Sequence, residues 1–213
     1  MEIFCLRNKT VRFIFVLIMT KAERTRQFII EKAAPILNKR GMAGTAISDI
    51  MEATKLAKGG VYGNFENKEE ICLEAYKYLT QTLSAAIDQS MEGKITAKDK
   101  LFALFDFYAE RLIKNDRGGC PILNFGTEAD DTNPLIKQKV KESISYSQNR
   151  IYKIAQIGID NGEFKETLDA RRFALKAFTM IEGAILISRV QGSNEHIKLI
   201  TDMIKFEIEQ NIK

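Results

Sequence analysis

Hydrophobic positions recur at helical spacing along nearly the whole chain. Within residues 21–40, the apolar side chains at positions 29, 33, 36 and 37 lie three or four apart, as one face of a helix requires. Gly41 then provides a stop signal. The same reasoning predicts further helices over residues 45–54, 58–64, 67–90, 96–112, 133–162, 169–191 and 194–211. No segment has the alternating pattern of a strand, so an all-α fold is predicted.

Several of these helices begin with capping residues. We expect Thr45 to cap the helix that ends at Thr54. Asn67 is expected to cap the long helix after it, with Glu70 reaching back to the cap. Asn133-Pro134 places a cap and a first-turn proline in the preferred order.

The composition excludes several kinds of site. His196 is the only histidine, so a cluster of histidine ligands and a histidine-centred triad are both excluded. The three cysteines, Cys5, Cys72 and Cys120, form no Cys-x-x-Cys pair, which argues against a disulfide framework and a thiolate zinc site. We therefore expect no metal or cofactor, and a reducing, cytoplasmic location.

The positive charge is concentrated near the N-terminus. Residues 20–65 hold eight basic and four acidic side chains, within a chain whose net charge is +4. A basic front end suits attraction to phosphate. Residues 1–19 are basic and then apolar, but their run of seven apolar residues is far shorter than the roughly 20 that span a bilayer. We interpret residues 1–19 as a leader read from an upstream start codon, with Met19 as the functional start; the alternative is a weak membrane tether.

Residues 45–64 have the spacing of a helix-turn-helix, whose second helix enters the major groove of DNA. This region resembles the TetR family of one-component bacterial transcription regulators through the run Ile50-x-x-Ala53-x-x-Leu56-x-Lys58-Gly59-x-Val61-Tyr62-x-x-Phe65-x-x-Lys68-Glu69-Glu70. The resemblance implies a DNA-binding domain over residues 23–83, with its helix-turn-helix at 46–65. It also implies a C-terminal effector and dimerisation domain over residues 84–213, and repression as the usual outcome.

Seven residues are predicted to contact DNA: Thr45, Lys58, Gly59, Gly60, Tyr62, Asn64 and Lys68. Lys58 begins the recognition helix, where it can reach a phosphate or a guanine edge. The Tyr62 hydroxyl is expected to reach a phosphate, although Tyr62 could instead pack between helices. Lys68 is placed for a backbone contact. Gly59, Gly60 and Gly63 are expected to form one bare face that approaches DNA closely.

The last two helices predict an interface between copies. Residues 169–191 are apolar almost all round, so that helix must be covered on every side. A twofold dimer is the commonest way to cover such a surface, and a thick monomeric bundle is the alternative. The predicted interface residues are Phe178, Ile181, Ala184, Ile185, Ile200, Met203 and Ile204.

The middle helices carry aromatic residues that predict a pocket for a small apolar effector, with a packed core as the alternative. The predicted lining residues are Phe102, Phe105, Tyr108, Cys120, Phe125, Tyr146 and Phe178. Cys120 lies in Gly119-Cys120-Pro121, a tripeptide that recurs in one branch of the TetR family. At a helix N-terminus, with Arg117 near, its thiol is expected to have a lowered pKa. The resemblance implies sensing of oxidants or electrophiles there, and the alternative is a small buried thiol.

We therefore predict a ligand-responsive repressor that acts as a homodimer on a palindromic DNA operator and is not an enzyme. One alternative is a repressor that senses redox state through Cys120. The others are a small helical enzyme relying on Asp, Glu or Tyr, and a membrane-associated module relying on residues 13–19. No stable association with a membrane is expected.

Overall fold

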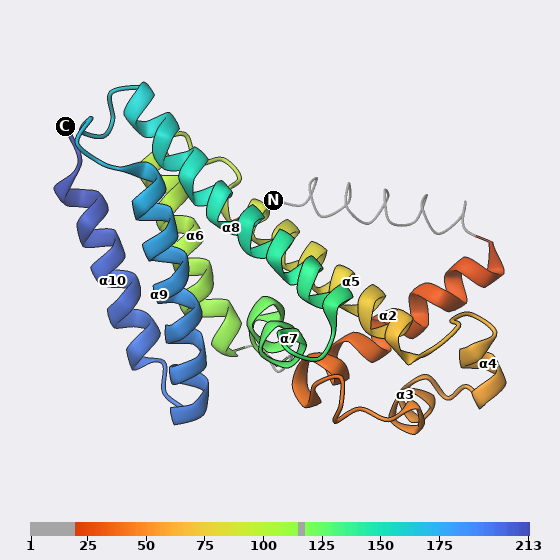
Figure 1. Ribbon diagram of the computed structural model, residues 1–213. Helices are drawn as coiled ribbons and strands as arrows, with labels where there is room; N and C mark the ends of the chain where they lie inside the picture. The colour runs from red at the N-terminus through yellow and green to blue at the C-terminus, as the bar shows by residue number, and fades with distance from the viewer. Residues whose placement is uncertain (1–19, 115–117) are drawn as a thin grey trace. The chain divides into compact units, whose positions relative to one another are not determined.

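The computed structural model describes residues 20–114 and 118–213, and its described residues are helical almost throughout (Figure 1). The helices are α2 (Lys21–Arg40), α3 (Ile47–Thr54), α4 (Lys58–Tyr62), α5 (Lys68–Met91), α6 (Ala97–Lys114), α7 (Pro121–Ala129), α8 (Pro134–Asp160), α9 (Ala170–Gln191) and α10 (Glu195–Gln210). Within the described ranges the only β pairing is an isolated bridge between Phe164 and Ile212. The predicted all-α fold is confirmed. The leader hypothesis for residues 1–19 lies outside the described residues.

The chain forms two compact units, which meet between Tyr78 and Leu79, inside α5. The predicted boundary at residue 83 also lies within this helix. The N-terminal unit packs α2 against α3 and α3 against α4. Its core is fully buried and aliphatic or aromatic, and includes Ile29, Ala33, Leu37, Ile50, Val61, Phe65 and Ile71.

Local capping explains most of the helix starts. Thr20 and Glu23 form a reciprocal capping box at the start of α2, with the Glu23 backbone N–H donating to Thr20 Oγ1 at 3.2 Å. Asn133 and Asp169 cap α8 and α9 as N-cap residues. Gly41 ends α2 with φ 78°, a conformation that favours glycine.

Two of the predicted caps differ from the structure. Ala46, not Thr45, is the N-cap of α3, and the Asp49 carboxylate accepts its backbone N–H at 2.7 Å. Thr45 is fully buried, and its hydroxyl donates to the Gly41 carbonyl at 2.7 Å. Asn67 does cap α5, but the Glu70 carboxylate accepts the N–H of Glu66 rather than that of the cap.

The C-terminal unit is built around α9, which packs against α6, α8 and α10, while α7 packs against α8. Its core consists of apolar side chains that are at most 3% exposed, among them Leu101, Leu104, Phe105, Phe125, Ile136, Ile151, Phe173, Ile181, Ile185 and Ile197. The start of α6 is held by a distant residue, because the Glu163 carboxylate accepts the N–H groups of Ala97 and Lys98, each at 2.8 Å.

Over the described ranges, none of the helices combines the length and apolar character that crossing a membrane requires.

Candidate functional site

The N-terminal unit contains a helix-turn-helix made of α3 and α4. The turn begins at Lys55, whose φ of 58° puts it in the left-handed region. It is the only residue other than glycine with a positive φ among the described residues. A side chain in that conformation costs roughly 1–2 kcal/mol, so the turn is closed at the expense of local strain.

The second helix, α4, is anchored by one buried side chain and presents two others to solvent. Val61 is fully buried, while Lys58 and Tyr62 are both exposed. The Lys58 ammonium lies 5.9 Å from the centre of the Tyr62 ring, so the two side chains occupy one patch. The exposure of Tyr62, at 38%, disagrees with the alternative that it packs between helices.

The glycines of this region do not form the single bare face that was expected. A Cβ on Gly59 would meet nothing within 4 Å, so the backbone there is open to a close approach. A Cβ on Gly60 would instead lie 3.4 Å from the Leu56 side chain, within the unit itself. Gly63 follows the end of α4 as its C-cap.

Asn64 and Thr45, two of the predicted DNA contacts, have structural roles inside the unit. The Asn64 amide donates to the Gly60 carbonyl at 2.8 Å and so closes the last turn of α4. The buried Thr45 side chain leaves no surface for a phosphate. The full burial of Thr45 disagrees with the prediction that it contacts DNA, whereas the half-buried Asn64 stays a predicted contact. Lys68 lies half-buried in the first turn of α5.

Arg26 holds the recognition helix in place, a role that was not predicted. Its guanidinium donates to the Asn64 carbonyl at 2.5 Å and to the Glu70 carboxylate at 2.6 Å. The same group lies 4.2 Å from the centre of the Phe65 ring. The N–H of Glu66 and the Arg26 guanidinium both lower the pKa of Glu70. Arg26 thus links α2 to the end of α4 and to the start of α5.

In the C-terminal unit, three polar side chains meet in the interior, and we name them the buried acidic cluster: Tyr108 of α6, Cys120 at the N-cap of α7, and Glu182 of α9. The Cys120 thiol donates to Glu182 Oε1 at 3.2 Å. Burial raises the pKa of Glu182 to about 7. Burial also raises the pKa of Tyr108, and the charges of Cys120 and Glu182 add to that effect.

The pKa of the Cys120 thiol is raised, whereas the sequence predicted a lowered pKa and a reactive thiolate. Burial raises its pKa well above the ordinary value, and the negative charge of Glu182 raises it further. The backbone N–H groups of Leu123 and Ile122 lower the pKa of this thiol, but by less than burial and Glu182 raise it. The predicted lowering of this pKa is therefore wrong, and the contribution expected from Arg117 lies outside the described residues.

The predicted pocket residues divide into two groups. Phe105, Tyr108, Cys120, Phe125 and Phe178 are all buried in the C-terminal unit. Phe102 is instead half-buried, with the ammonium groups of Lys98 and Lys205 at 5.1 and 5.2 Å from its ring centre. Tyr146 is 58% exposed and accepts a hydrogen bond from Arg150 at 3.0 Å. The exposure of Tyr146 disagrees with a place in an interior pocket, whereas Phe102 stays a predicted lining residue.

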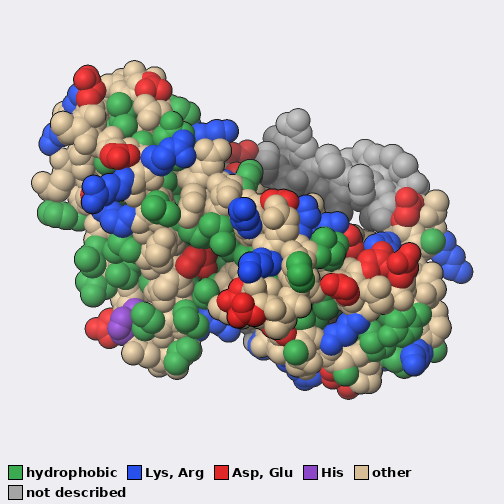
Figure 2. Space-filling view, in the orientation of Figure 1, with side chains coloured by type: hydrophobic (Ala, Val, Ile, Leu, Met, Phe, Trp, Pro, Cys, Tyr) green, Lys and Arg blue, Asp and Glu red, His purple; other side chains and the backbone are tan. Residues whose placement is uncertain are grey.

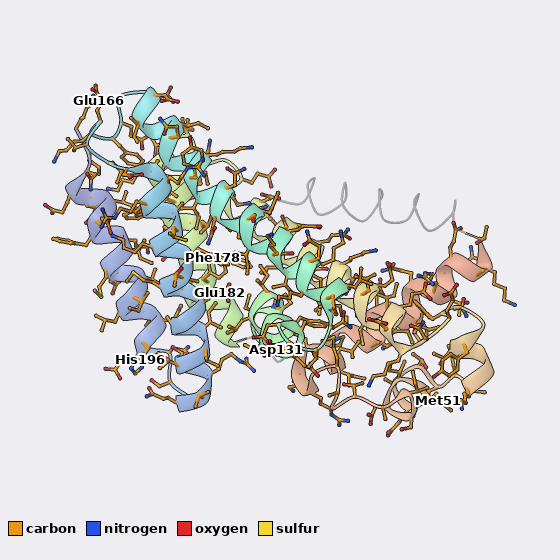
Figure 3. The ribbon with its side chains drawn as sticks, in the orientation of Figure 1. Met51, Asp131, Glu166, Phe178, Glu182 and His196 are labelled. Atoms are coloured by element: carbon orange, nitrogen blue, oxygen red, sulfur yellow. The ribbon has the colours of Figure 1, made fainter. Side chains whose placement is uncertain are left out.

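Glu182 was missed as a site residue, although the sequence held a signal for it. It is the only acidic residue of α9, and Phe178 lies one helical turn before it on the same helix (Figure 3). A single carboxylate on the buried side of an apolar helix is unusual enough to mark a candidate site.

Most of the predicted interface residues lie inside their own subunit. Phe178, Ile181, Ala184, Ile185 and Ile204 are all at most 6% exposed, because they pack within the C-terminal unit. Ile200 is half-buried and only Met203, at 52%, is exposed. The prediction that the five buried residues form the interface is therefore wrong.

Other apolar side chains of α9 and α10 are exposed. Apart from Leu175, near the start of α9, we name them the α9–α10 apolar face: Leu186, Ile187 and Val190 on α9, with Leu199, Met203 and Phe206 on α10. Figure 2 shows hydrophobic side chains gathered over the α10 edge of this unit, on the side where His196 lies. Exposed apolar patches of this kind mark interaction surfaces.

Two family models together match most of the chain. The model for "Bacterial regulatory proteins, tetR family" matches residues 29–75, and the model for "Tetracyclin repressor-like, C-terminal domain" matches residues 97–204. Together they account for both units of the structure.

Relatives agree with this assignment over nearly their whole length. A TetR-family transcriptional regulator from Cytophaga hutchinsonii superposes with a TM-score of 0.85 at 34% identity, covering 91% of this chain and 98% of that protein. A TetR transcriptional regulator from Chloroflexus aurantiacus has a TM-score of 0.86, with the same identity and coverage. The HTH-type transcriptional repressor DhaR from Mycobacterium sp. is 24% identical over 174 residues, covering 80% of this chain and 85% of that protein.

The helix-turn-helix, the all-helical C-terminal unit and these relatives agree, and they confirm the prediction of a DNA-binding regulator rather than an enzyme. The chain belongs to the TetR family of bacterial transcriptional regulators.

Proposed function

We propose that this protein is a transcriptional repressor that binds a palindromic operator as a homodimer and releases it when a small effector binds. The observation that carries the proposal is the patch on α4, where Lys58 and Tyr62 stand exposed on the second helix of a helix-turn-helix. DhaR, a relative of this chain, is named as a repressor.

Four residues are assigned to DNA in this proposal. Lys58 contacts a base edge or a phosphate, and the Tyr62 hydroxyl contacts a phosphate. Gly59 lets the backbone of α4 approach the groove, because it has no side chain and no protein atom lies within 4 Å of the place where a Cβ would be. Lys68 contacts the sugar–phosphate backbone from the first turn of α5.

The α9–α10 apolar face is the proposed dimer interface. Its six side chains are each 44–78% exposed in the single chain, which is a large apolar surface to leave in water. A twofold axis through this face would pair identical patches, and two identical DNA-binding units then select a palindromic site.

The C-terminal unit is the proposed effector domain, with a small apolar effector bound among its buried aromatic residues. The alternative of a redox sensor at Cys120 is disfavoured, because a thiol with a raised pKa holds little of the reactive thiolate.

Selection of bound DNA from a random pool, at a stated salt concentration, tests the proposal. With the selected operator, Lys68→Ala should weaken binding to all sequences evenly and lower the salt slope by about one unit. Lys58→Ala should in addition blur the preference at one base pair in each half-site. Lys94→Ala is the matched control, because Lys94 is an exposed lysine of the C-terminal unit. If both variants bind as the parent does, the assigned DNA surface is wrong.

A further inference from the structure

Glu182 is a carboxylic acid whose hydrogen bonding is incomplete in the interior of the C-terminal unit. The residue is only 9% exposed, and its Oε2 atom is buried with no hydrogen-bond partner among the described residues. Its other oxygen, Oε1, accepts only the weak thiol donor of Cys120. A buried oxygen without a donor costs free energy, so such a group in a native structure requires an explanation.

No positive charge of the described residues compensates this carboxyl group. Glu182 takes part in none of the ion pairs that join described residues. Its polar neighbours in the cluster, Cys120 and Tyr108, are acids whose pKa values are raised, so neither supplies a positive charge. Buried carboxylates are normally paired with a cation or with several donors, and within residues 20–114 and 118–213 this one has neither.

The surroundings of Glu182 suit an organic cation. Phe178 lies one turn away on α9 and Phe125 lies in α7, the helix that Cys120 caps; both are buried. Tyr108 adds a third buried ring. Aromatic faces attract cations through their quadrupole, so buried aromatic residues on the helices that carry this cluster favour a positively charged group on an apolar body.

We propose that Glu182 is the anchor for an effector that carries a cationic group, such as a protonated amine, on an apolar body. The cation would supply the donor that Oε2 lacks, while the apolar body packs among the aromatic side chains. This inference rests on the proposed function, since it assigns a chemical class to the effector of the C-terminal unit.

The binding should strengthen as the pH rises through neutrality, because only the ionised carboxylate pairs with a cation. With a pKa of about 7, the ionised fraction of Glu182 rises about tenfold between pH 6 and pH 8. Tyr108 of α6 and Cys120 at α7 stay protonated over this range, and the cation that acts on Tyr108 is Arg150 of α8. The guanidinium of Arg189 on α9 lies against Gly119. On α10, no titratable group acts on the described members of the cluster.

The experiment compares probes that differ only in their head group. Octylammonium, 1-octanol and octanoate share one tail, and 1-naphthylmethylammonium and 1-naphthalenemethanol form a second matched pair. Binding to the full chain is measured by titration calorimetry at pH 6 and pH 8. At pH 8 the cations should bind about 10- to 100-fold more tightly than their neutral counterparts, the range expected of a hydrogen bond to a charged group. The preference should shrink about tenfold at pH 6.

Glu182→Gln should abolish both the preference for cations and its pH dependence. Glu195→Gln is the matched control, because it removes one exposed carboxylate from α10 and should leave both unchanged. Circular dichroism reports whether Glu182→Gln is folded. If the variant is unfolded, the head-group preference and the pH dependence measured on the parent test the proposal without it.

Three results would overturn the inference: no binding of either cation to the parent, equal binding of cations and neutral probes, or a preference that survives in folded Glu182→Gln. Binding of the selected operator is measured separately on the parent. Normal operator binding with no preference for cations refutes the effector class alone, whereas loss of operator binding refutes the proposed function.

Discussion

Replacement of Arg26 with methionine should loosen the recognition helix without unfolding the chain. The variant removes the hydrogen bonds to the Asn64 carbonyl and the Glu70 carboxylate, and the contact with the Phe65 ring. Methionine keeps an apolar stem of similar length, so the loss is mainly polar.

The magnitude follows from the three contacts. A hydrogen bond from a charged donor contributes about 1.5–3 kcal/mol, and a partly exposed cation–π contact about 0.5–1 kcal/mol. The ion pair with Glu70 adds little, because its two side chains are 33% and 29% exposed. We therefore expect local stability at the end of α4 to fall by about 2–3 kcal/mol.

Hydrogen exchange of a peptide that covers residues 57–65 measures this loss directly. A loss of 2–3 kcal/mol should speed exchange of the α4 amides about 30- to 150-fold, and operator affinity should fall with it. Lys21→Met is the control, because it removes one exposed positive charge from the same helix. In a double-mutant cycle, Arg26→Met and Glu70→Gln should show a coupling of about 1 kcal/mol. Unchanged α4 exchange in Arg26→Met would refute the assigned role.

Three further predictions concern other parts of the chain. Lys55→Gly should raise the free energy of urea unfolding by up to about 1 kcal/mol, because glycine adopts the left-handed φ of this position without strain. Lys55→Ala should give no such gain, and equal stability of the two variants would contradict the strain. Val190→Glu should give a folded monomer by light scattering, because Val190 is 78% exposed and lies on the proposed interface. Ala184→Glu should instead unfold the C-terminal unit, because Ala184 is buried. If Val190→Glu still forms a dimer, this face is not the interface. Cys120 should react with iodoacetamide at a rate that still rises above pH 8 in a variant lacking Cys5 and Cys72, and a midpoint well below pH 8 would contradict its raised pKa.

The helices were predictable from sequence because their signals are local. Asn133-Pro134 and Asp169 act within one turn of the helices that they start, so the sequence contains the whole interaction. Thr45 failed as a cap because its hydroxyl instead donates to the Gly41 carbonyl, four residues earlier. Threonine offers several local hydrogen bonds, and tertiary packing decides among them.

Of the candidate site residues, only those whose exposure follows from the helix-turn-helix motif were predictable from sequence. Lys58 and Tyr62 were predicted to contact DNA, and both side chains are exposed, as such a contact requires. The role of Arg26 was not predictable, because its partner Asn64 is 38 residues away in sequence. The buried acidic cluster joins residues 62 positions apart, and no periodicity brings them together.

The interface residues failed for a different reason. A helix that is apolar on all sides must be covered on all sides, but the pattern does not say which side faces its own subunit. In α9, Ile181 and Ile185 face inward while Leu186 and Val190 face solvent. That division depends on where the neighbouring helices lie.

The stability of the chain without effector should depend on pH through Glu182. Its pKa rises from the ordinary 4.5 to about 7 on folding, so the folded state holds a proton that the unfolded state has lost. This contribution is fully present below pH 4.5 and is lost as the pH rises to about 7, with a total of ~3 kcal/mol.

Urea unfolding of the parent and of Glu182→Gln, measured from pH 5 to pH 8, isolates this effect from that of the other carboxylates. The parent should lose about 2.5 kcal/mol relative to the variant over this range, because glutamine cannot ionise. Glu195→Gln should follow the parent. Parallel curves for the parent and Glu182→Gln would mean that the carboxylate ionises at no cost. A cation bound beside Glu182 should restore the lost stability at pH 8, because it binds only the ionised, folded form.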